Sequence, residues 1–250
     1  MTFRTALVTG ASSGIGRGLA LALAKRGTKV YAAARRRPEL ESLATEAVSG
    51  LIRIVELDVA DADHTEAVIR ELDANDPLDL VVANAGIGGF TPGDKLDWPT
   101  VRRILQVDLM GAVATLCAAS AGMVVRGRGH LAGVSSLAAF RGLPKNAAYS
   151  ASKAGLSMFL ESIRLDLVGT GVAVTTICPG FVRTPLTRDL GKLPFIVEVD
   201  EAVTTILASL DKKDPVCAFP ATQAVPMRTL GLLPPSLYDF VGKHLRRYIP

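Results

Sequence analysis

A tyrosine and a lysine stand four residues apart in the segment NAAYSASKAG, residues 146–155. On a helix this spacing places Tyr149 and Lys153 on one face. A free phenol has a pKa of about 10, and a neighbouring ammonium favours its ionised form, so these two groups could pass a proton to or from a substrate near neutral pH. The small neighbouring residues leave room for a reaction centre. They equally suit a tightly packed helix whose lysine extends to solvent, and both interpretations stay open at this point.

A glycine-rich turn, TGASSGIG (9–16), follows the first apolar run of the chain. Glycines can form a tight turn, let the backbone approach a pyrophosphate and let a helix pack closely on a strand. A helix that begins near residue 15 would direct free N–H groups and its positive dipole end at phosphate. An ordinary strand-to-helix turn is the alternative, but the position of the glycines favours a dinucleotide site. The expected phosphate-binding residues are Gly10, Ser12, Ser13, Gly14, Ile15 and Gly16.

Three arginines follow the second apolar run. A site for NAD(H) usually has a carboxylate here, which accepts a hydrogen bond from the ribose 2′-hydroxyl. This chain has Ala34 followed by Arg35, Arg36 and Arg37, and arginine suits bidentate recognition of a 2′-phosphate. We therefore expect NADP(H) to be favoured, with NAD(H) as the alternative. Arg35 is the first candidate contact and Arg36 the second, whereas Arg37 fits a solvated surface.

These residues must be positioned by apolar runs that alternate with helical patterns. Strands are expected at about 4–9, 28–34, 51–57, 78–84, 129–135, 172–178 and 215–219, and helices near 15–26, 38–48, 63–73, 98–125, 147–169 and 200–210. Nearly continuous apolar strands separated by helices predict an α/β fold, a doubly wound parallel sheet with helices on both faces. We find no internal repeat or linker and expect a single domain over residues 1–250. Ligands should bind beyond the carboxyl ends of the strands.

The composition narrows the classes of protein. Hydrophobic residues make up 49% of the 250 residues and charged residues 21%, which is typical of an ordered globular protein. The net charge of +4 is mild and aromatic residues are only 5%, so a nucleic-acid partner is not expected. Scattered Cys117, Cys178 and Cys217, with no apparent secretory signal, favour a cytoplasmic protein.

Two further patterns argue against a metal site and a membrane span. His64, His130 and His244 lie far apart and have no ligand spacing, so no metal is expected. The uncharged run at 109–125 is short and rich in small residues, which favours a buried or subunit-facing helix over a transmembrane one.

Four further motifs appear in order along the chain: LDV (57–59), NAG (84–86), SS (135–136) ahead of YSASK (149–153), and PGFVRT (179–184). Together with TGASSGIG they resemble the short-chain dehydrogenase/reductase family in its compact form. The resemblance runs from residue 4 to about residue 185. It fades beyond Thr184, where the substrate segments of this family vary.

The resemblance implies a strand order of 3-2-1-4-5-6-7 and a role for each matching residue. Tyr149 matches the general acid/base and Lys153 its partner, which would also hold the nicotinamide ribose. Ser136 matches the serine that orients the substrate, and Ser135 fits that position less well. The positions matching cofactor contacts are Asp58 and Val59 at the adenine, Asn84, Ala85 and Gly86 over the adenosine half, and Pro179, Gly180, Val182 and Thr184 beside the nicotinamide. Homodimers or homotetramers are usual in the family.

One residue departs from the family pattern. The helix before the Ser136 strand usually carries an asparagine that completes a proton relay with the lysine, and this chain has Asp108 in the stretch VDLMG. An ionised carboxylate only accepts hydrogen bonds, whereas an amide also donates them. Asp108 could stabilise the Lys153 ammonium or compete with Tyr149 for it. Alternatively, the position acts mainly through its backbone and aspartate substitutes at little cost.

The expected activity is NADP(H)-dependent hydride transfer involving an alcohol, ketone or aldehyde. The segment at about 185–200 should line the substrate site together with residues 90–92 and 137–143. The segment contains apolar residues that favour a lipophilic substrate: Leu186, Leu190, Leu193 and Phe195. Nearby arginines could bind an acid group of the substrate or face water: Arg141, Arg183 and Arg188. The tail at about 221–250 joins apolar residues to terminal bases, which permits contact with a membrane surface or a subunit.

Two other functions compete with this one. A catalytically weak or inactive protein of the same fold could bind the cofactor as a regulator or scaffold, and Asp108 is the feature that favours it. A sugar-nucleotide epimerase or dehydratase would normally need a longer substrate domain than this chain has.

Overall fold

The computed structural model describes residues 3–47, 50–188, 190–191 and 193–245, and within them it contains one parallel sheet. Its strands are β1 (Thr5–Thr9), β2 (Lys29–Ala34), β3 (Ile52–Glu56), β4 (Leu80–Ala83), β5 (Gly129–Val134), β6 (Val172–Pro179) and β7 (Val216–Phe219). They lie in the order β3-β2-β1-β4-β5-β6-β7, and every neighbouring pair is parallel. The predicted fold class and strand order are thereby confirmed. The order reverses between β1 and β4, so the loops after these strands diverge and leave room for a ligand.

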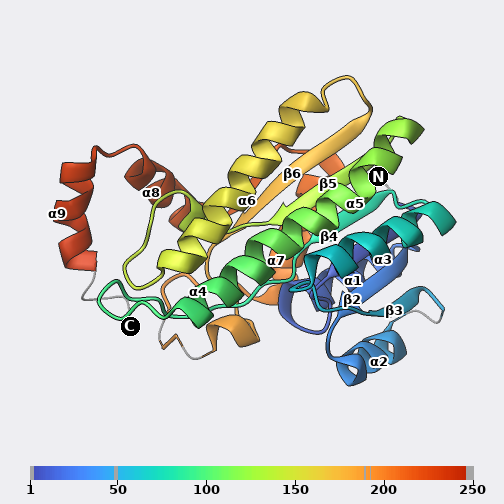
Figure 1. Cartoon of the computed structure of the whole chain (residues 1–250), viewed down its shortest axis with the longest axis horizontal. Coiled ribbons are helices and arrows are strands. Elements are labelled where there is room, and N and C mark those ends of the chain that lie inside the picture. Colours follow the sequence, from blue (N-terminus) through green and yellow to red (C-terminus); the bar gives the residue numbers. More distant parts are fainter. Residues whose placement is uncertain (1–2, 48–49, 189, 192, 246–250) are drawn as a thin grey trace.

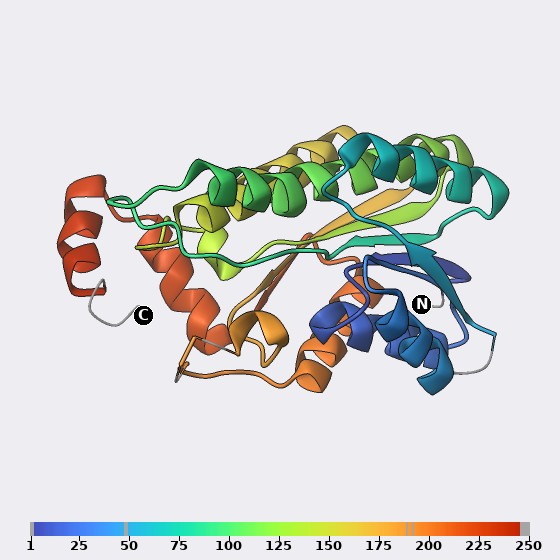
Figure 2. The ribbon, with the colours of Figure 1, turned by 60° about the horizontal axis from the view of Figure 1, so that its bottom comes forward.

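Helices cover both faces of the sheet (Figure 1 and Figure 2). One face carries α1 (Gly14–Lys25), α2 (Arg37–Glu46) and α7 (Val199–Lys212), and the other carries α3 (Ala62–Asn75), α4 (Trp98–Leu105), α5 (Ala112–Arg126) and α6 (Ala147–Asp166). The centre of β1 is apolar because both of its faces are buried: Ala6 and Val8 pack into the core under α1, while Leu7 packs into the core under α5.

A π-helical turn (Gln106–Gly111) interrupts the helix predicted over 98–125 and separates α4 from α5. It carries Asp108, which is fully buried. Gly111 ends the turn, and a Cβ there would lie 2.3 Å from the Val59 carbonyl oxygen, so only glycine lets the helix approach the loop after β3 this closely. Single π-turns inside α-helices are frequent at functional sites.

The helical stretch Trp98–Arg126 is also long and apolar enough to cross a bilayer by composition alone. Its most apolar window is 56% buried inside the structure. Leu116 and Met123 pack in the core against the sheet, which agrees with the predicted buried helix.

The C-terminal region forms two helices that the sequence did not predict, α8 (Ala221–Gly231) and α9 (Pro235–Leu245). Ala224 of α8 packs against Leu137 and Cys178. The Tyr238 hydroxyl of α9 donates to the Gly142 carbonyl, and the Arg141 guanidinium lies 4.3 Å from the centre of the Tyr238 ring. The two helices therefore extend the end of the molecule that carries the loop after β5. Residues 246–250, which include the terminal bases of the predicted tail, lie outside the described residues.

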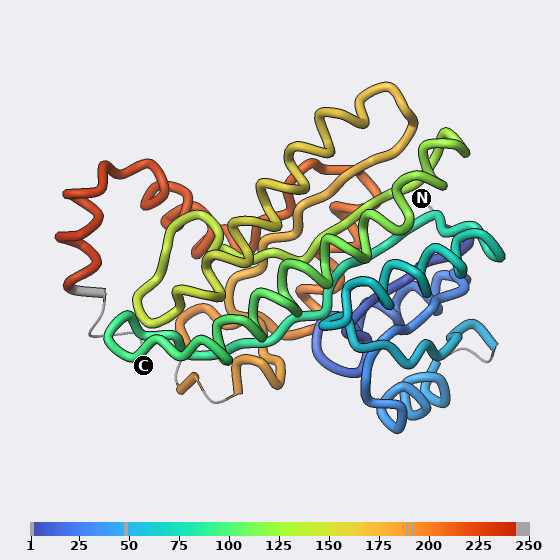
Figure 3. Tube along the Cα trace, viewed as in Figure 1, coloured from blue at the N-terminus to red at the C-terminus, as the bar shows by residue number. Residues whose placement is uncertain are grey.

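The loops after β4 and β5 run side by side at this same end (Figure 3). The Thr91 amide donates to the Lys145 carbonyl at 2.8 Å, and Thr91 and Asn146 form a parallel bridge. This contact places the start of α6, and so Tyr149, against the segment that follows β4.

Candidate active site

The glycine turn lies against the loop after β4. Gly10 and Gly14 adopt positive φ angles of 67° and 56°, which favour glycine. A Cβ at Gly10 would lie 2.7 Å from the Ala85 Cα, and one at Gly16 would lie 2.4 Å from the Asn84 Nδ2. The glycines therefore permit both the turn and the close approach.

Asn84 fastens the ends of two strands. Its Nδ2 donates to the Thr9 carbonyl at 2.8 Å, and the Thr9 hydroxyl accepts from the amides of Asn84 and Ala85 at 3.0 and 3.1 Å. The side chain thus holds the carboxyl ends of β1 and β4 together. A role of residues 84–86 over an adenosine remains a prediction.

The helix α1 begins at Gly14, within the glycine turn. Its N-cap, Ser13, makes no capping hydrogen bond, and the first turn of α1 contains no acidic residue. The amides at this end need acceptors from outside the helix, so the turn fits a phosphate group.

The three arginines have separate partners. Arg36 Nη2 donates to the hydroxyls of Ser12 and Ser13 at 2.9 and 3.0 Å. Arg35 lies 3.7 Å from Asp58, whereas Arg37 binds Glu41 at 2.9 Å. Arg35 was the first candidate contact from the sequence, and the structure places Arg36 directly on the glycine turn.

Lys153 is buried, and the interpretation in which it extends to solvent is wrong. Its side chain is 4% exposed, and its Nζ donates to the Val134 carbonyl at 3.0 Å. The same Nζ lies 3.4 Å from Asp108 Oδ2 and 5.6 Å from the centre of the Tyr149 ring. Tyr149 is half-buried. The spacing of four residues therefore brings the ammonium and the phenol together, as predicted.

Asp108 connects Lys153 to the loop after β4. Its Oδ1 accepts from the Ile87 amide at 2.8 Å, while Oδ2 has no hydrogen-bond partner among the described residues and faces the Lys153 ammonium. Burial raises the pKa of this carboxyl, opposed by the Lys153 charge and the Ile87 N–H. A Cβ on Gly86 would lie 3.3 Å from Lys153 Nζ, so the backbone of the NAG motif passes directly over this ion pair.

The two serines after β5 have different environments. The Ser135 hydroxyl is buried, donates to the Lys153 carbonyl at 2.8 Å and lies 2.7 Å from the Ser157 hydroxyl. The Ser136 hydroxyl accepts from the Ala138 amide at 3.1 Å and is half-buried. That acceptance leaves its proton for another acceptor, so Ser136 suits a substrate oxygen better than Ser135 does.

The loop after β6 closes on the glycine turn. A Cβ on Gly14 would lie 3.1 Å from Thr184 Cγ2, and Thr184 forms a capping box with Thr187 in a short 3₁₀ turn, Pro185–Thr187. Val182 is buried. The expected nicotinamide loop and the expected phosphate turn are therefore neighbours, at the carboxyl edge of the sheet.

The positions expected at the adenine lie beside the same edge. Asp58 is exposed and its carboxylate accepts from the Ala60 amide at 3.1 Å, whereas Val59 is buried against Gly111. Of the residues expected to line a substrate site, Phe90, Leu186 and Phe195 are exposed, while Leu190 and Leu193 are half-buried.

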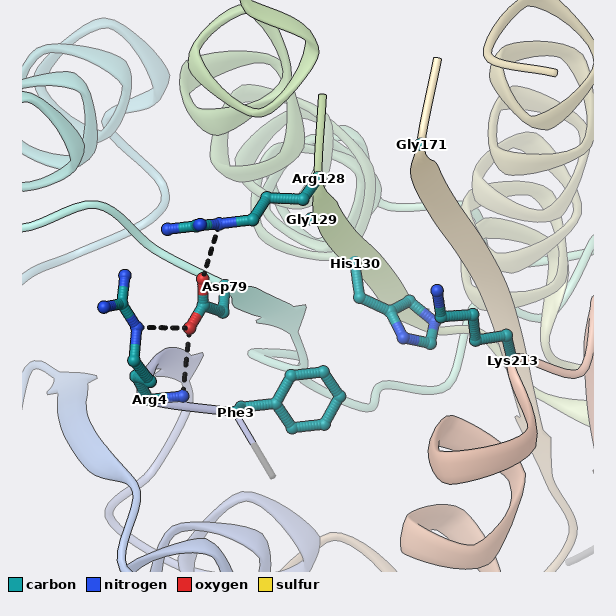
Figure 4. A pocket seen from close by; sticks show the side chains of 8 residues that line it. All are labelled: Phe3, Arg4, Asp79, Arg128, Gly129, His130, Gly171 and Lys213. Atoms are coloured by element: carbon teal, nitrogen blue, oxygen red, sulfur yellow. Dashed lines mark hydrogen bonds and ion pairs between the residues drawn. The ribbon is translucent and has the colours of Figure 1, made fainter. Parts of the chain in front are cut away.

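A cavity of about 310 Å³ opens at the opposite edge of the sheet (Figure 4). Arg4 and Arg128 both bind Asp79 there, and burial lowers the pKa of His130 to about 4. None of its lining residues belongs to the candidate active site, so the cavity is separate from the Tyr149–Lys153 pair and the glycine turn.

Sequence reasoning predicted Arg36, Ser12 and Ser13 as cofactor contacts but not their hydrogen bonds to one another, because these depend on the course of β2. One group that shapes the site was missed. Gln223, at the start of α8, accepts from the Phe181 amide at 3.1 Å, beside the expected nicotinamide loop. Nothing in its sequence context marks it, because its partners are backbone groups.

Comparison with known proteins finds dehydrogenase and oxidoreductase relatives that match most of the chain. A family model described as short chain dehydrogenase matches residues 4–193. An "Uncharacterized oxidoreductase" of Myxococcus xanthus is 53% identical over 250 residues, which cover 98% of this chain and 99% of that protein. A second "Uncharacterized oxidoreductase", Rv0945 of Mycobacterium tuberculosis, is 32% identical over 95% of this chain and 96% of its own length.

Solved structures agree with the fold. A short-chain dehydrogenase from Burkholderia cenocepacia in complex with NADP has a TM-score of 0.81 and 28% identity, covering 98% of each chain. One from Sphingobium yanoikuyae in complex with NADPH has a TM-score of 0.81 and 25% identity, covering 98% of this chain and 96% of that one.

The raised pKa of Asp108 predicts how stability depends on pH. A carboxyl whose pKa is higher in the folded state binds more protons there than in the unfolded chain. The stabilisation that this carboxyl gives to the fold is fully present below its pKa in the unfolded chain, about 3.9. It is lost as the pH rises through the pKa of the carboxyl in the folded protein. Asp108→Asn removes this titration and keeps an acceptor for Ile87.

We therefore expect the free energy of unfolding of Asp108→Asn, relative to wild type, to rise as the pH increases above about 4, measured by urea denaturation. A relative stability that falls over this range would mean that the Lys153 charge outweighs burial in setting this pKa.

Proposed function

The chain belongs to the short-chain dehydrogenase family, and on that premise we propose that it is an NADP(H)-dependent oxidoreductase acting on an alcohol or a carbonyl compound. The observation that carries the proposal is the juxtaposition of Tyr149 with a buried Lys153 ammonium, 5.6 Å from its ring. Ser136 follows β5, and the glycine turn follows β1, at the same edge of the sheet. Proton transfer and cofactor binding can therefore occur side by side.

The residues of the glycine turn and the loop after β6 fit a dinucleotide. The positive φ angles, the close backbone approach and the α1 N-terminus suit a pyrophosphate, and Pro179, Gly180, Val182 and Thr184 would flank the nicotinamide. When bound, the nicotinamide supplies or accepts the hydride. All proton chemistry then falls to side chains of this chain.

In the reductive direction, Tyr149 donates its phenolic proton to the substrate oxygen as the carbonyl carbon gains a hydride. The Lys153 ammonium stabilises the resulting phenolate by Coulomb attraction, which is stronger in a buried site than in water. The Ser136 hydroxyl donates a hydrogen bond to the same oxygen and orients the carbonyl. Oxidation of an alcohol runs these steps in reverse.

Asp108 positions the ammonium in this proposal. Because its carboxylate contacts both the Ile87 amide and Lys153, it fixes the lysine at the Val134 carbonyl, beneath the NAG segment. This favours a direct side-chain role over a purely backbone one. The same ion pair supports the second candidate, a cofactor-binding scaffold with weak turnover, because a carboxylate that neutralises Lys153 reduces its effect on Tyr149.

Three observations support NADP(H) as the cofactor. Arg36 lies on the serines of the glycine turn, Arg35 lies beside it in sequence, and similar structures hold NADP and NADPH. Two guanidinium groups at the end of β2 would meet a 2′-phosphate with charge-assisted hydrogen bonds.

The exposed apolar residues Phe90, Leu186 and Phe195 support a lipophilic substrate. Arg183 is paired with Glu198 at 2.7 Å and Arg141 stacks on Tyr238, which weakens the case for an acidic substrate group.

Exposed apolar side chains and free cysteines bear on the proposed oligomeric state, surface contacts and location of the protein. Exposed Val125, Met158 and Leu165 on α5 and α6 support a homodimer or homotetramer, and exposed Leu232 and Phe240 support a contact of the C-terminal helices with a membrane surface or subunit. Free cysteines support a cytoplasmic location.

Replacement of Tyr149 tests the proton transfer. Tyr149→Phe keeps the ring and removes the hydroxyl, so kcat with NADPH and a reducible ketone should fall by about 10²–10⁴-fold. The dissociation constant of NADPH, measured by fluorescence titration, should stay close to that of wild type. Full activity of Tyr149→Phe would contradict the assignment.

Replacement of each arginine tests the cofactor preference. Arg36→Ala should lower the ratio of kcat/KM for NADPH to that for NADH by about tenfold or more, because it removes a charged hydrogen bond to phosphate. Arg35→Ala should act in the same direction. Arg37→Ala is the matched control, because its guanidinium binds Glu41 and Glu56 rather than the serines of the glycine turn, and its ratio should match wild type. A wild-type ratio of kcat/KM for NADPH to that for NADH in all three variants would reject the 2′-phosphate site.

A further inference from the structure

Two segments after β6 run parallel to each other. The Val197 amide donates to the Phe181 carbonyl at 2.9 Å, and the Arg183 amide donates to the Val197 carbonyl at 2.8 Å. Val182 and Val197 form a parallel bridge. This short ladder attaches the expected substrate segment to the expected nicotinamide loop.

The Gln223 side chain supplies the next rung of this ladder. In a parallel pair the following bond would join the Phe181 amide to the Phe195 carbonyl. Instead, the Phe181 amide donates to Gln223 Oε1 at 3.1 Å, and Gln223 Nε2 donates to the carbonyls of Phe195 and Pro194 at 2.8 and 3.2 Å. The side-chain amide is thus inserted between the two segments like a peptide group, with its acceptor and both of its donors used.

The fold around Gln223 is arranged for this insertion. A Cβ on Gly180 would lie 2.3 Å from Gln223 Oε1, so glycine at this position makes room for the amide. The Gly180 amide donates to the Phe219 carbonyl at 2.7 Å, and the amides of Gln223 and Ala224 donate to the Pro220 carbonyl in the first turn of α8. The end of β7 and the start of α8 therefore hold the Gln223 backbone in a fixed position beside the loop after β6.

We propose that Gln223 is a positioning residue that sets where the substrate segment lies relative to the nicotinamide loop. This inference rests on the proposed function for its catalytic consequence, but not for its structural one. Among the described residues, the Gln223 side chain makes its hydrogen bonds to the backbone of residues 181 and 194–195. Its loss should release the substrate segment, raise KM for the carbonyl substrate and leave NADPH bound to the glycine turn.

Two substitutions distinguish the acceptor role of Gln223 Oε1 from the donor role of Gln223 Nε2. Gln223→Glu keeps an acceptor for the Phe181 amide but removes both donors and places negative charge at two carbonyl oxygens. Gln223→Met keeps the length of the side chain and removes all three hydrogen bonds. Thr222→Ala is the matched control, one residue away on the same exposed turn.

Hydrogen exchange of the Val197 and Arg183 amides tests the structural part without any turnover. We expect exchange about tenfold faster in Gln223→Glu and Gln223→Met than in wild type or Thr222→Ala, the change expected when hydrogen bonds of ordinary strength are lost. Unchanged exchange in the β4 and β5 amides would show that the variants are folded. Wild-type exchange at residues 183 and 197 in both folded variants would overturn the proposal.

Steady-state kinetics tests the catalytic part. Both variants should raise KM for a reducible ketone by about tenfold, with an NADPH dissociation constant close to wild type. Faster exchange with unchanged kinetics would reduce Gln223 to a local anchor and overturn the proposed positioning. If wild type reduces no carbonyl compound, the proposed function fails, while the exchange measurement still decides whether Gln223 holds the segment.

Discussion

The buried ammonium of Lys153 is the interaction on which the rest of the site depends. A charge in a protein interior is strongly destabilising unless it is paired and hydrogen-bonded. Lys153 is compensated by the Val134 carbonyl from β5 and the Asp108 carboxylate from the π-turn, and Asp108 is itself held by the Ile87 amide. The requirement to satisfy one charge thus fixes β5, α6, the π-turn and the loop after β4 relative to one another, and Tyr149 takes its position from that arrangement.

The cofactor end and the substrate end of the site are built from different parts of the chain. The glycine turn, Asn84 and Arg36 belong to the first four strands, and their contacts are made largely within that half. The substrate end combines segments after β4, β5, β6 and β7, joined by Thr91, Gln223 and Tyr238. The two ends meet where Thr184 packs against Gly14 and where the Thr91 amide donates to the Lys145 carbonyl.

Much of this architecture follows from the sequence. Each of the seven apolar runs became a strand close to its predicted bounds, since burial on both faces leaves a strong signal. The strand order needed the resemblance to a family, because periodicity does not determine which strands are neighbours. The π-turn at Asp108 was missed because it has the same apolar periodicity as the helix around it. The helices α8 and α9 were not predicted. Pro226 lies inside α8, where proline disfavours a helix, whereas Pro235 is the first residue of α9, where proline is tolerated.

Hydride transfer to a carbonyl carbon beside Tyr149 is the central proposal for this chain. The most direct measurement is mass spectrometry of the alcohol formed from a ketone by the purified protein with NADPH that carries deuterium at both C4 positions of the nicotinamide. The alcohol should contain one deuterium, at the former carbonyl carbon. An alcohol without deuterium at that carbon, or no alcohol from any ketone or aldehyde tested, would contradict the proposal.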